Sequence, residues 1–254
     1  MNRITGIIIT LNEEDNIAEC IKGISSFCDD IIVVDSLSKD KTVQIAEEMG
    51  ARVYLQKYLG DGPQRIYGAQ FAKNDWILSI DADERPEADM LEAIANLKLD
   101  DPSTAYAFRR KSYVGNHWIK AAGFYPDYVT RLYNRTTSHY LDRKSHSKVI
   151  APKTTKLDSH IYHLTYESYA HWLQRLDWFT TRDAWALYER GVKPSNIKPV
   201  TSCIGAFIRK MIIKGGIFQG LDGMTVTLTS MMRAYMKYIK LNELHEEKAA
   251  NQRD

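Results

Sequence analysis

The chain has 254 residues, and its 34 Lys and Arg against 32 Asp and Glu give a net charge of +2. This length can form a buried core without disulfides or structural metals. A hydrophobic fraction of 44% with 26% charged residues is typical of a globular protein and excludes general disorder and a polytopic membrane protein. The charge balance predicts no nucleic-acid partner. Three cysteines without CxxC spacing disfavour a disulfide framework and indicate a reducing compartment.

The first hundred residues alternate strand and helix patterns. Short apolar, β-branched runs predict strands at residues 4–10, 31–34, 52–54 and 76–80, with helices after the first three. We expect Asn12 to cap the first helix. This alternation predicts an α/β fold with a doubly wound, mostly parallel sheet. Ligands bind beyond the carboxyl ends of such strands, so Asp35 and Asp81 should share one crevice.

From residue 104 to about 150 the pattern is strand-like and irregular, and after Tyr166 it becomes helical. We therefore predict two domains, an α/β domain over residues 1–165 and a helical region over 166–254. The apolar run Ile7–Ile9 is too short for a signal peptide and acids follow it closely, which predicts a cytoplasmic protein.

The helical region has its own pattern. Pro194 and Pro199 are expected to bracket a linker, and two amphipathic helices should follow between residues 201 and 241, joined near Gly215 and Gly216. Helical spacing predicts that three tryptophans lie in the core: Trp172, Trp178 and Trp185.

Residues 198–240 are strongly basic. They hold seven Lys and Arg and one acid, Asp222, for a net charge of +6, so the remainder of the chain carries −4. Amphipathic helices with basic edges bind the interface of anionic membranes. We predict an anionic membrane surface as a partner, and the alternative is that the helices pack on the protein with solvated basic residues.

Asp81 and Asp83 stand one residue apart where a buried strand ends. Their side chains point the same way, so both can reach one hard cation. Mg²⁺ and Mn²⁺ prefer oxygen ligands and share them with substrate phosphates. Such an ion would neutralise the charge on a departing diphosphate. The alternative is a solvated acidic turn before the next helix.

Three motifs follow three predicted strands in order: Thr10-Leu11-Asn12-Glu13-Glu14, Asp35-Ser36 with Asp40-Lys41-Thr42, and Asp81-Ala82-Asp83-Glu84. This ordered set resembles the family 2 glycosyltransferases, whose nucleotide-sugar domain has the GT-A fold. The resemblance implies inverting transfer of a hexose from a UDP-sugar donor, with Mg²⁺ or Mn²⁺. It also implies ligand contacts: uridine at Thr10, Leu11 and Glu13, the base or ribose at Asp35, the nucleotide at Arg65, the diphosphate and metal at Asp81 and Asp83. Helix capping, loop formation and a surface ion pair are the structural alternatives for these residues.

Catalysis by this route needs a base for the acceptor hydroxyl. The resemblance favours Asp127, although the Glu-Asp pair of many relatives is missing here. The alternative for Asp127 is a turn or a pair with Arg131. His146 is the reserve candidate, and it lacks the glutamate that follows it in many relatives.

Two further sets of residues are secondary candidates. One of His160 and His163 could complete the metal shell, as a late histidine does in some GT-A enzymes, and core hydrogen bonding is the alternative. Trp118 and Phe124 are candidates for stacking on sugar faces.

The basic tail extends the resemblance. Gly216-Ile217-Phe218 and Leu221-Asp222-Gly223 are similar to the bacterial β-glucosyltransferases of the lipopolysaccharide core oligosaccharide. This likeness implies glucose transfer from UDP-glucose to an inner-core heptose of a lipid-linked saccharide acceptor, by a peripheral protein on the inner face of the cytoplasmic membrane.

Two other functions stay open from the sequence. A nucleotidyltransferase has a similar sheet, but it usually carries a glycine-rich basic loop after the first strand, and residues 10–17 hold no glycine and no basic residue. A nucleotide-sugar-binding, membrane-docking protein without a catalytic base is the non-enzymatic alternative.

Overall fold

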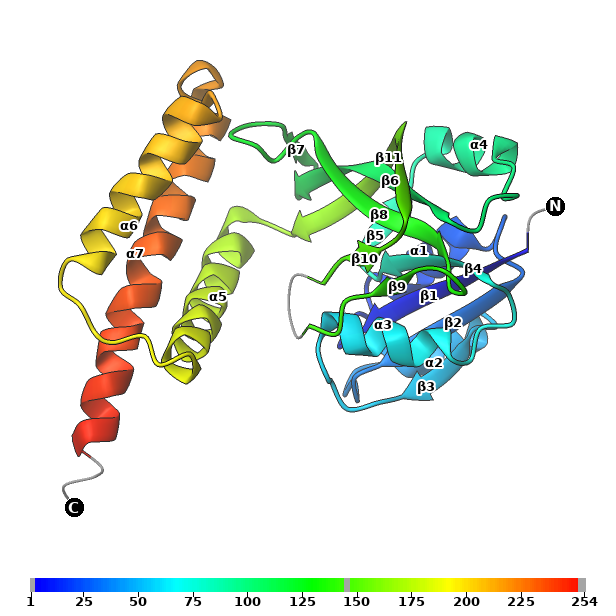
Figure 1. Ribbon diagram of the computed structural model, residues 1–254, viewed down its shortest axis with the longest axis horizontal. Coiled ribbons are helices and arrows are strands. Elements are labelled where there is room, and N and C mark those ends of the chain that lie inside the picture. Colours follow the sequence, from blue (N-terminus) through cyan, green and yellow to red (C-terminus); the bar gives the residue numbers. More distant parts are fainter. Residues whose placement is uncertain (1–2, 144–146, 251–254) are drawn as a thin grey trace. The chain divides into compact units, whose positions relative to one another are not determined.

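The computed structural model describes residues 3–143 and 147–250. The chain divides into two compact units, one of Met1–Lys111 with Pro126–Leu164 and one of Ser112–Tyr125 with Thr165–Asp254. Strands and helices are coloured along the chain in Figure 1. The functional division predicted at residue 165 stays a prediction.

The first unit is built on a central sheet. Its elements are β1 (Ile4–Thr10), α1 (Ile17–Ile24), β2 (Asp30–Asp35), α2 (Thr42–Glu48), β3 (Arg52–Leu55), α3 (Asp61–Ala69), β4 (Trp76–Asp81), β5 (Glu84–Pro86), α4 (Ala88–Asn96), β6 (Thr104–Val114), β8 (Asp127–Asn134), β9 (His139–Tyr140), β10 (Val149–Ile150) and β11 (Lys153–Tyr166). Strands β6 and β11 continue into the second unit. The order in the sheet is β3-β2-β1-β4-β8-β6-β11-β5, and β9 pairs with β10 separately.

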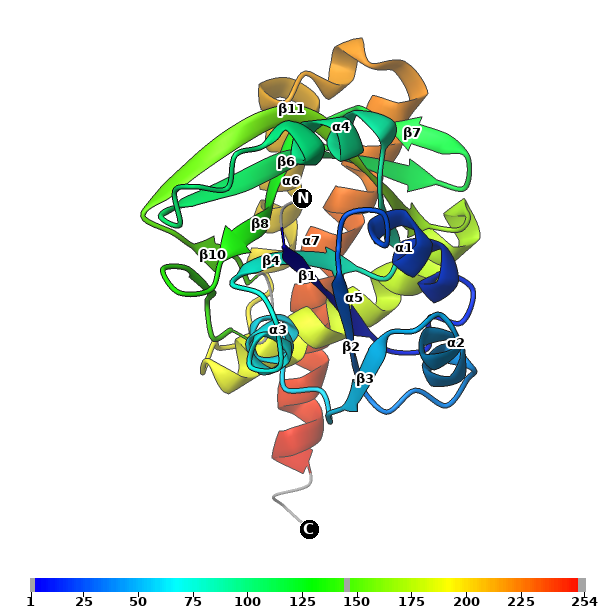
Figure 2. The same cartoon turned by 90° about the vertical axis from the view of Figure 1, so that its right-hand side faces the viewer.

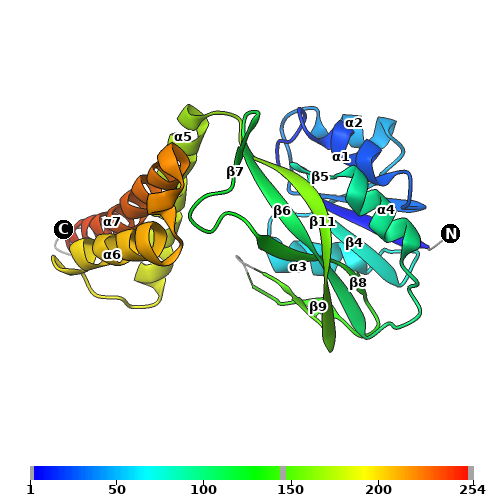
Figure 3. The ribbon, with the colours of Figure 1, turned by 90° about the horizontal axis from the view of Figure 1, so that it is seen from above.

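The strands β3, β2, β1 and β4 are parallel, and β8 joins β4 in the antiparallel sense. The predicted α/β class is therefore confirmed. Successive residues of a strand face opposite sides, and β1 buries both. Ile8 packs with the apolar residues of α1, whereas Ile7 packs with Ile66 and Tyr67 of α3. Figures 2 and 3 show α1 and α2 on one side of β1 and α3 on the other.

The predicted cap of the first helix is wrong. The helix begins at Ile17 after Asn16, and Asn12 lies before it with a φ of 55°. The side-chain oxygen of Asn12 accepts a hydrogen bond from the backbone N–H of Lys39 at 2.9 Å. Asn12 therefore ties two loops together, a use of asparagine that helix-start patterns do not distinguish from capping.

The second unit is mainly helical. It contains β7 (His117–Ile119), α5 (Tyr169–Glu189), α6 (Lys198–Phe207), a π-helical turn η1 (Ile208–Ile213), a 3-10 turn η2 (Gly216–Phe218) and α7 (Gly220–Ala250). Helix α7 packs against both α5 and α6. The chain reverses at Gly215, whose φ of 68° suits glycine, so the two predicted amphipathic helices and their joint are confirmed. None of the helices in the described ranges is long and apolar enough to cross a membrane.

Pro199 lies in the first turn of α6, at the end of the predicted linker, and at this position the missing N–H of proline costs nothing. The prediction for the three tryptophans is wrong in part. Trp172 is buried as predicted, but Trp178 and Trp185 are exposed. Helix α5 buries a stripe at every fourth residue from Trp172, and the other two tryptophans lie off that stripe. Arg175 and Arg182 cover Trp178 through cation–π contacts instead.

Candidate functional site

The first two motifs meet at the carboxyl ends of β1 and β2. Thr10 pairs with Asp35 in the parallel register, and its hydroxyl donates to the Asp35 carboxylate at 2.8 Å. Asp35 is fully buried and also accepts from the backbone N–H of Ser38 at 2.7 Å. The loop after β1 is fastened to the second motif by three more bonds: Asn12 N–H to Ser38, Glu13 N–H to Thr42 and Glu14 N–H to Asp40. Leu11 stays exposed on this loop.

Helix α3 delivers Arg65 to the end of β4. The first turn of α3 lies against the segment after β9, where the N–H of Gly62 donates to the carbonyl oxygen of Arg143 at 3.2 Å. A Cβ at position 62 would lie 2.0 Å from the carbonyl oxygen of Leu141, so only glycine fits there. Arg65 is buried, forms an ion pair with Asp81, and stacks over the ring of Tyr140. The alternative of a surface ion pair for Arg65 is therefore wrong, because the arginine is buried and its partner Asp81 is only partly exposed.

Asp81 is held by two guanidinium groups. One carboxylate oxygen contacts Arg65 and the other contacts Arg131 at 2.7 Å. Burial disfavours the charged carboxylate, but Arg131 and Arg65 more than offset this and hold the pKa of Asp81 well below its usual range. Asp81 is consequently an anion at any physiological pH.

Glu84 lies beneath this group and was not assigned a role from the sequence. Its side chain is fully buried and forms an ion pair with Arg131, and Arg110 lies 3.5 Å away. Its second oxygen accepts the backbone N–H of Asp81 at 3.2 Å. Glu84 therefore fixes both the arginines and the start of the turn that carries Asp83.

Asp83 faces His163. The Asp83 carboxylate lies 3.3 Å from Nε2 of His163, which β11 places beside β5 through the pairing of His163 with Glu84. Burial lowers the pKa of His163, but the Asp83 carboxylate raises it by more, so the pKa lies above its usual value. The pair offers one carboxylate and one imidazole at the same place.

Asp127 does not pair with Arg131, so that alternative is wrong. Antiparallel pairing sets Asp127 of β8 opposite Arg110 of β6. The Arg110 guanidinium donates to Oδ2 of Asp127 at 2.7 and 3.0 Å. In the parts of the chain that the structure describes, no donor reaches Oδ1. His146, the reserve candidate, lies outside the described residues.

A cavity of about 590 Å³ in the first unit has a volume typical of small-molecule sites, and of the predicted site residues its lining includes Arg65 and Asp81. Thr10, Leu11, Asp35, Asp83 and Asp127 are not on this lining, so the crevice that Asp35 was expected to share with Asp81 is not this cavity. The charged part of its lining is mostly basic and comprises Arg65, Arg110, Arg131 and Lys148 against Asp61 and Asp81. A surface with several guanidinium groups suits the phosphates of a nucleotide, because arginine donates in a fork that matches phosphate oxygens. The sequence missed Arg110, whose position depends on strand pairing rather than on a motif.

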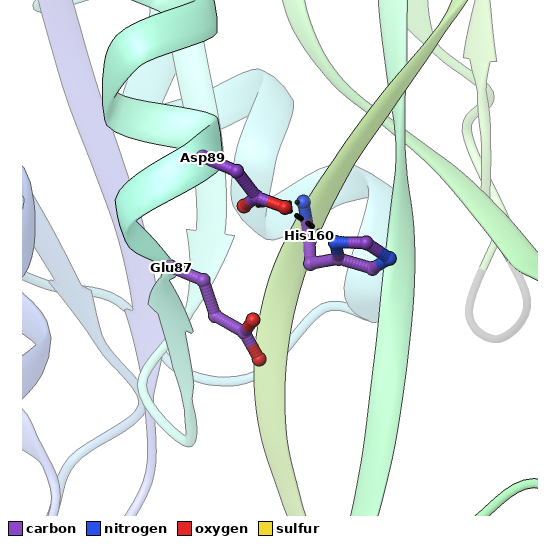
Figure 4. A group of neighbouring side chains, drawn as sticks. All are labelled: Glu87, Asp89 and His160. Atoms are coloured by element: carbon purple, nitrogen blue, oxygen red, sulfur yellow. Dashed lines mark hydrogen bonds and ion pairs between the residues drawn. The ribbon is translucent and has the colours of Figure 1, made fainter.

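The other histidine candidate lies in a separate cluster. His160 donates its backbone N–H to Asp89 at 3.0 Å, and its Nδ1 contacts the same carboxylate. Glu87 completes a group of three possible ligands at the start of α4, shown in Figure 4. Glu87 also forms an ion pair with Lys111. These contacts match the alternative of structural hydrogen bonding for His160.

An α/β fold with a basic crevice at the ends of its parallel strands is typical of enzymes that bind nucleotides. A profile described as glycosyl transferase family 2 matches residues 5–159, and the chain belongs to this family. The resemblance seen in the motifs is confirmed, and the protein is a glycosyltransferase of the GT-A class rather than a nucleotidyltransferase or a non-catalytic binding protein.

The chain is similar to an uncharacterized glycosyltransferase of Rickettsia bellii, with 30% identity over 96% of this chain and 86% of the relative. It is 23% identical to the lipopolysaccharide core biosynthesis glycosyltransferase LpsC of Rhizobium meliloti, over 97% of this chain and 94% of that protein. Among solved structures, glucosyl-3-phosphoglycerate synthase from Mycobacterium tuberculosis in complex with Mn²⁺, UDP and glucosyl-3-phosphoglycerate matches 44% of each chain at 25% identity and a TM-score of 0.36.

Proposed function

We propose that this glycosyltransferase transfers a hexose, glucose from UDP-glucose, with inversion to a heptose in the lipid-linked inner core of lipopolysaccharide. The observation that carries the donor half is the basic cavity, which Arg65, Arg110 and Arg131 line together with Asp81 at the end of β4. The similarity to LpsC over nearly the whole of both chains supports the acceptor half.

The predicted site residues and the arginines of the cavity would have separate roles. Thr10, Leu11, Glu13 and Asp35 would border the uridine, and Arg65 with Arg131 would face the diphosphate. Both arginines are held by Asp81, so they are already oriented before the donor binds. Asp127 would take the proton from the acceptor hydroxyl, because Arg110 orients the carboxylate and binds only one of its oxygens.

The donor atoms fit a divalent ion. Asp83 and His163 provide a carboxylate oxygen and an imidazole nitrogen in contact, a set that Mn²⁺ accepts. Asp81 would have to move to join them, because its carboxylate oxygens do not lie within 4.8 Å of both of these ligand atoms. A bound Mg²⁺ or Mn²⁺ would supply positive charge to the diphosphate as the glycosidic bond breaks.

The first test measures the donor reaction. We expect hydrolysis of UDP-glucose to UDP in the presence of Mn²⁺, faster turnover with a truncated heptose-bearing core acceptor, and loss of both with EDTA. Asp127→Asn should lower transfer to the acceptor by about 10²- to 10⁴-fold while UDP binding stays unchanged. Release of a sugar monophosphate in place of UDP, or full activity in EDTA, would refute the proposal.

A membrane-facing surface would bring the enzyme to a lipid-linked acceptor. The turn between α6 and α7 exposes large apolar side chains: Ile213 (72%), Ile217 (63%), Phe218 (90%) and Leu221 (82%). Exposed apolar clusters of this kind mark protein or membrane contacts. Arg209 and Lys214 lie beside this apolar turn in the sequence, which favours an anionic lipid surface.

Replacing Phe218 and Leu221 by Ser should therefore release the protein from vesicles of phosphatidylglycerol and phosphatidylcholine, with at least about a tenfold weaker partition coefficient. The matched control is Leu173→Ser with Trp178→Ser, two exposed apolar residues on α5, which should leave partition unchanged. Equal sedimentation of all three proteins with vesicles would show that the apolar turn does not bind lipid.

A further inference from the structure

The second unit contains a cavity that the donor reaction does not use. Its volume is about 410 Å³, and it is lined by residues of α5, α6, η1 and α7 together with Phe124 and Tyr166. Small side chains on the facing sides of the helices leave this space, among them Ala206 of α6 and Ala234 of α7. The size lies within the range of about 300–1,000 Å³ that small-molecule sites occupy.

The cavity has a surplus of positive charge. Arg209, Lys210, Arg233 and Lys237 line it, and Asp183 is its acid. Asp183 is already paired with Arg233, whose Nε and Nη2 both lie 2.9 Å from one carboxylate oxygen. Across the described ranges, no carboxylate lies within ion-pair distance of the other three cations. The lining therefore carries three positive charges that the protein does not neutralise.

The charged form of Lys210 is destabilised by its surroundings. It is half-buried, and its ammonium donates to the carbonyl oxygen of Ala122 at 3.0 Å and lies over the ring of Phe124. Burial, followed by the charges of Arg209 and Lys214, lowers the pKa of Lys210. An anion in the cavity would remove this repulsion, so the site is electrostatically prepared for one.

The other lining residues indicate which kind of molecule would bear the anionic group. The rings of Phe124, Tyr166 and Phe179 form an apolar wall, and Tyr166 stacks on Trp172 at 4.9 Å, which holds it in place. The hydroxyls of Ser202 and Ser230 lie on α6 and α7. A sugar ring presents apolar C–H faces and hydroxyl edges, so it can use both kinds of wall.

The geometry points to a binding site for a phosphorylated saccharide, with the phosphomonoester at Arg209, Lys210 and Lys237 and the sugar against the aromatic wall. A phosphomonoester carries about −1.5 to −2 charges at pH 7, which matches three cations better than a single carboxylate does. The further step, that this saccharide is part of the acceptor, rests on the proposed function.

The test is calorimetric titration of the full chain with glucose 1-phosphate. We expect saturable binding that Arg209→Gln with Lys237→Gln weakens at least about tenfold, because two charge-assisted hydrogen bonds to the phosphate are lost. The matched control is Arg190→Gln with Lys193→Gln, which removes the same charge from exposed positions of the same unit outside the cavity. Ala206→Leu fills the cavity without a change of charge and should weaken binding too.

Comparison ligands and the activity of the variants test the separate parts of the proposal. Glucose alone should bind much more weakly, and inorganic phosphate that binds as tightly as the sugar phosphate would refute the role of the sugar. Binding of phosphatidylglycerol vesicles that depends on Arg209 and Lys237, without binding of the sugar phosphate, would overturn the proposal in favour of a lipid headgroup. UDP-glucose hydrolysis should be unchanged in every cavity variant. If hydrolysis is absent from all proteins while sugar phosphate still binds, the proposed function fails and the cavity site stands.

Discussion

Replacing Asp83 by Asn should lower kcat for hexose transfer by about 10²- to 10³-fold, the usual loss when one group that stabilises the developing charge is removed. The amide keeps the shape of the side chain but cannot supply the anionic oxygen that a divalent ion requires. The Asp83 pair with His163 is partly exposed, so the free energy of unfolding should fall by about 1 kcal/mol or less. The measurement is steady-state transfer at saturating Mn²⁺, with urea unfolding alongside.

A second readout separates metal binding from general damage. Mn²⁺ binding followed by electron paramagnetic resonance should weaken in Asp83→Asn and in His163→Gln, and it should be unchanged in Asp100→Asn, an exposed acid of the same unit. The pKa of His163 should also fall in Asp83→Asn, because the carboxylate that raises it is gone. Normal transfer and normal Mn²⁺ binding in both variants would remove the metal role from this pair.

The positions of the three motifs at one edge of the sheet were predictable, because they depend only on local sequence and on the parallel arrangement of the strands. Each motif follows its own strand, and parallel strands end at one edge, so Thr10 and Asp35 become neighbours in the register. The same rule placed Asp81 beside them in the sheet order, since β4 is the other neighbour of β1. No long-range pairing had to be known to reach this result.

The partners of the acids were not predictable in this way. Asp127 and Arg131 stand four residues apart, which suggests contact on a helix, but they belong to a strand, where four residues span about 13 Å. Their true partners come from antiparallel pairings of distant segments: Arg110 opposite Asp127, and Asp81 and Glu84 around Arg131. Motifs record residue types near a strand end, whereas these contacts depend on the register of β6 and β8.

The exposed tryptophans show a related limit. The spacing of the three tryptophans fits one face of a helix only approximately. In α5, Trp172 lies on the buried stripe, whereas Trp178 and Trp185 lie off it. Arg175 and Arg182 then cover Trp178. Long basic side chains bury their stems on aromatic surface, and this makes an exposed tryptophan tolerable in a way that hydropathy does not record.

Glu84→Gln should be the most destabilising single change in the crevice, with a loss of about 3–5 kcal/mol in the free energy of unfolding. The Glu84 carboxylate is fully buried between Arg131 and Arg110, and its removal leaves buried guanidinium charge with only Asp81 and Asp127 to balance it. Urea denaturation measures the loss. The control is Glu87→Gln, three residues further along the chain, which breaks a partly exposed pair with Lys111 and should cost less than about 1 kcal/mol. Transfer activity should fall in Glu84→Gln even at low temperature, where the protein stays folded, because the arginines lose the anchor that aims them at the diphosphate. Equal stability of the two variants would mean that Asp81 alone positions the arginines and that the Glu84 ion pairs do not stabilise this part of the protein.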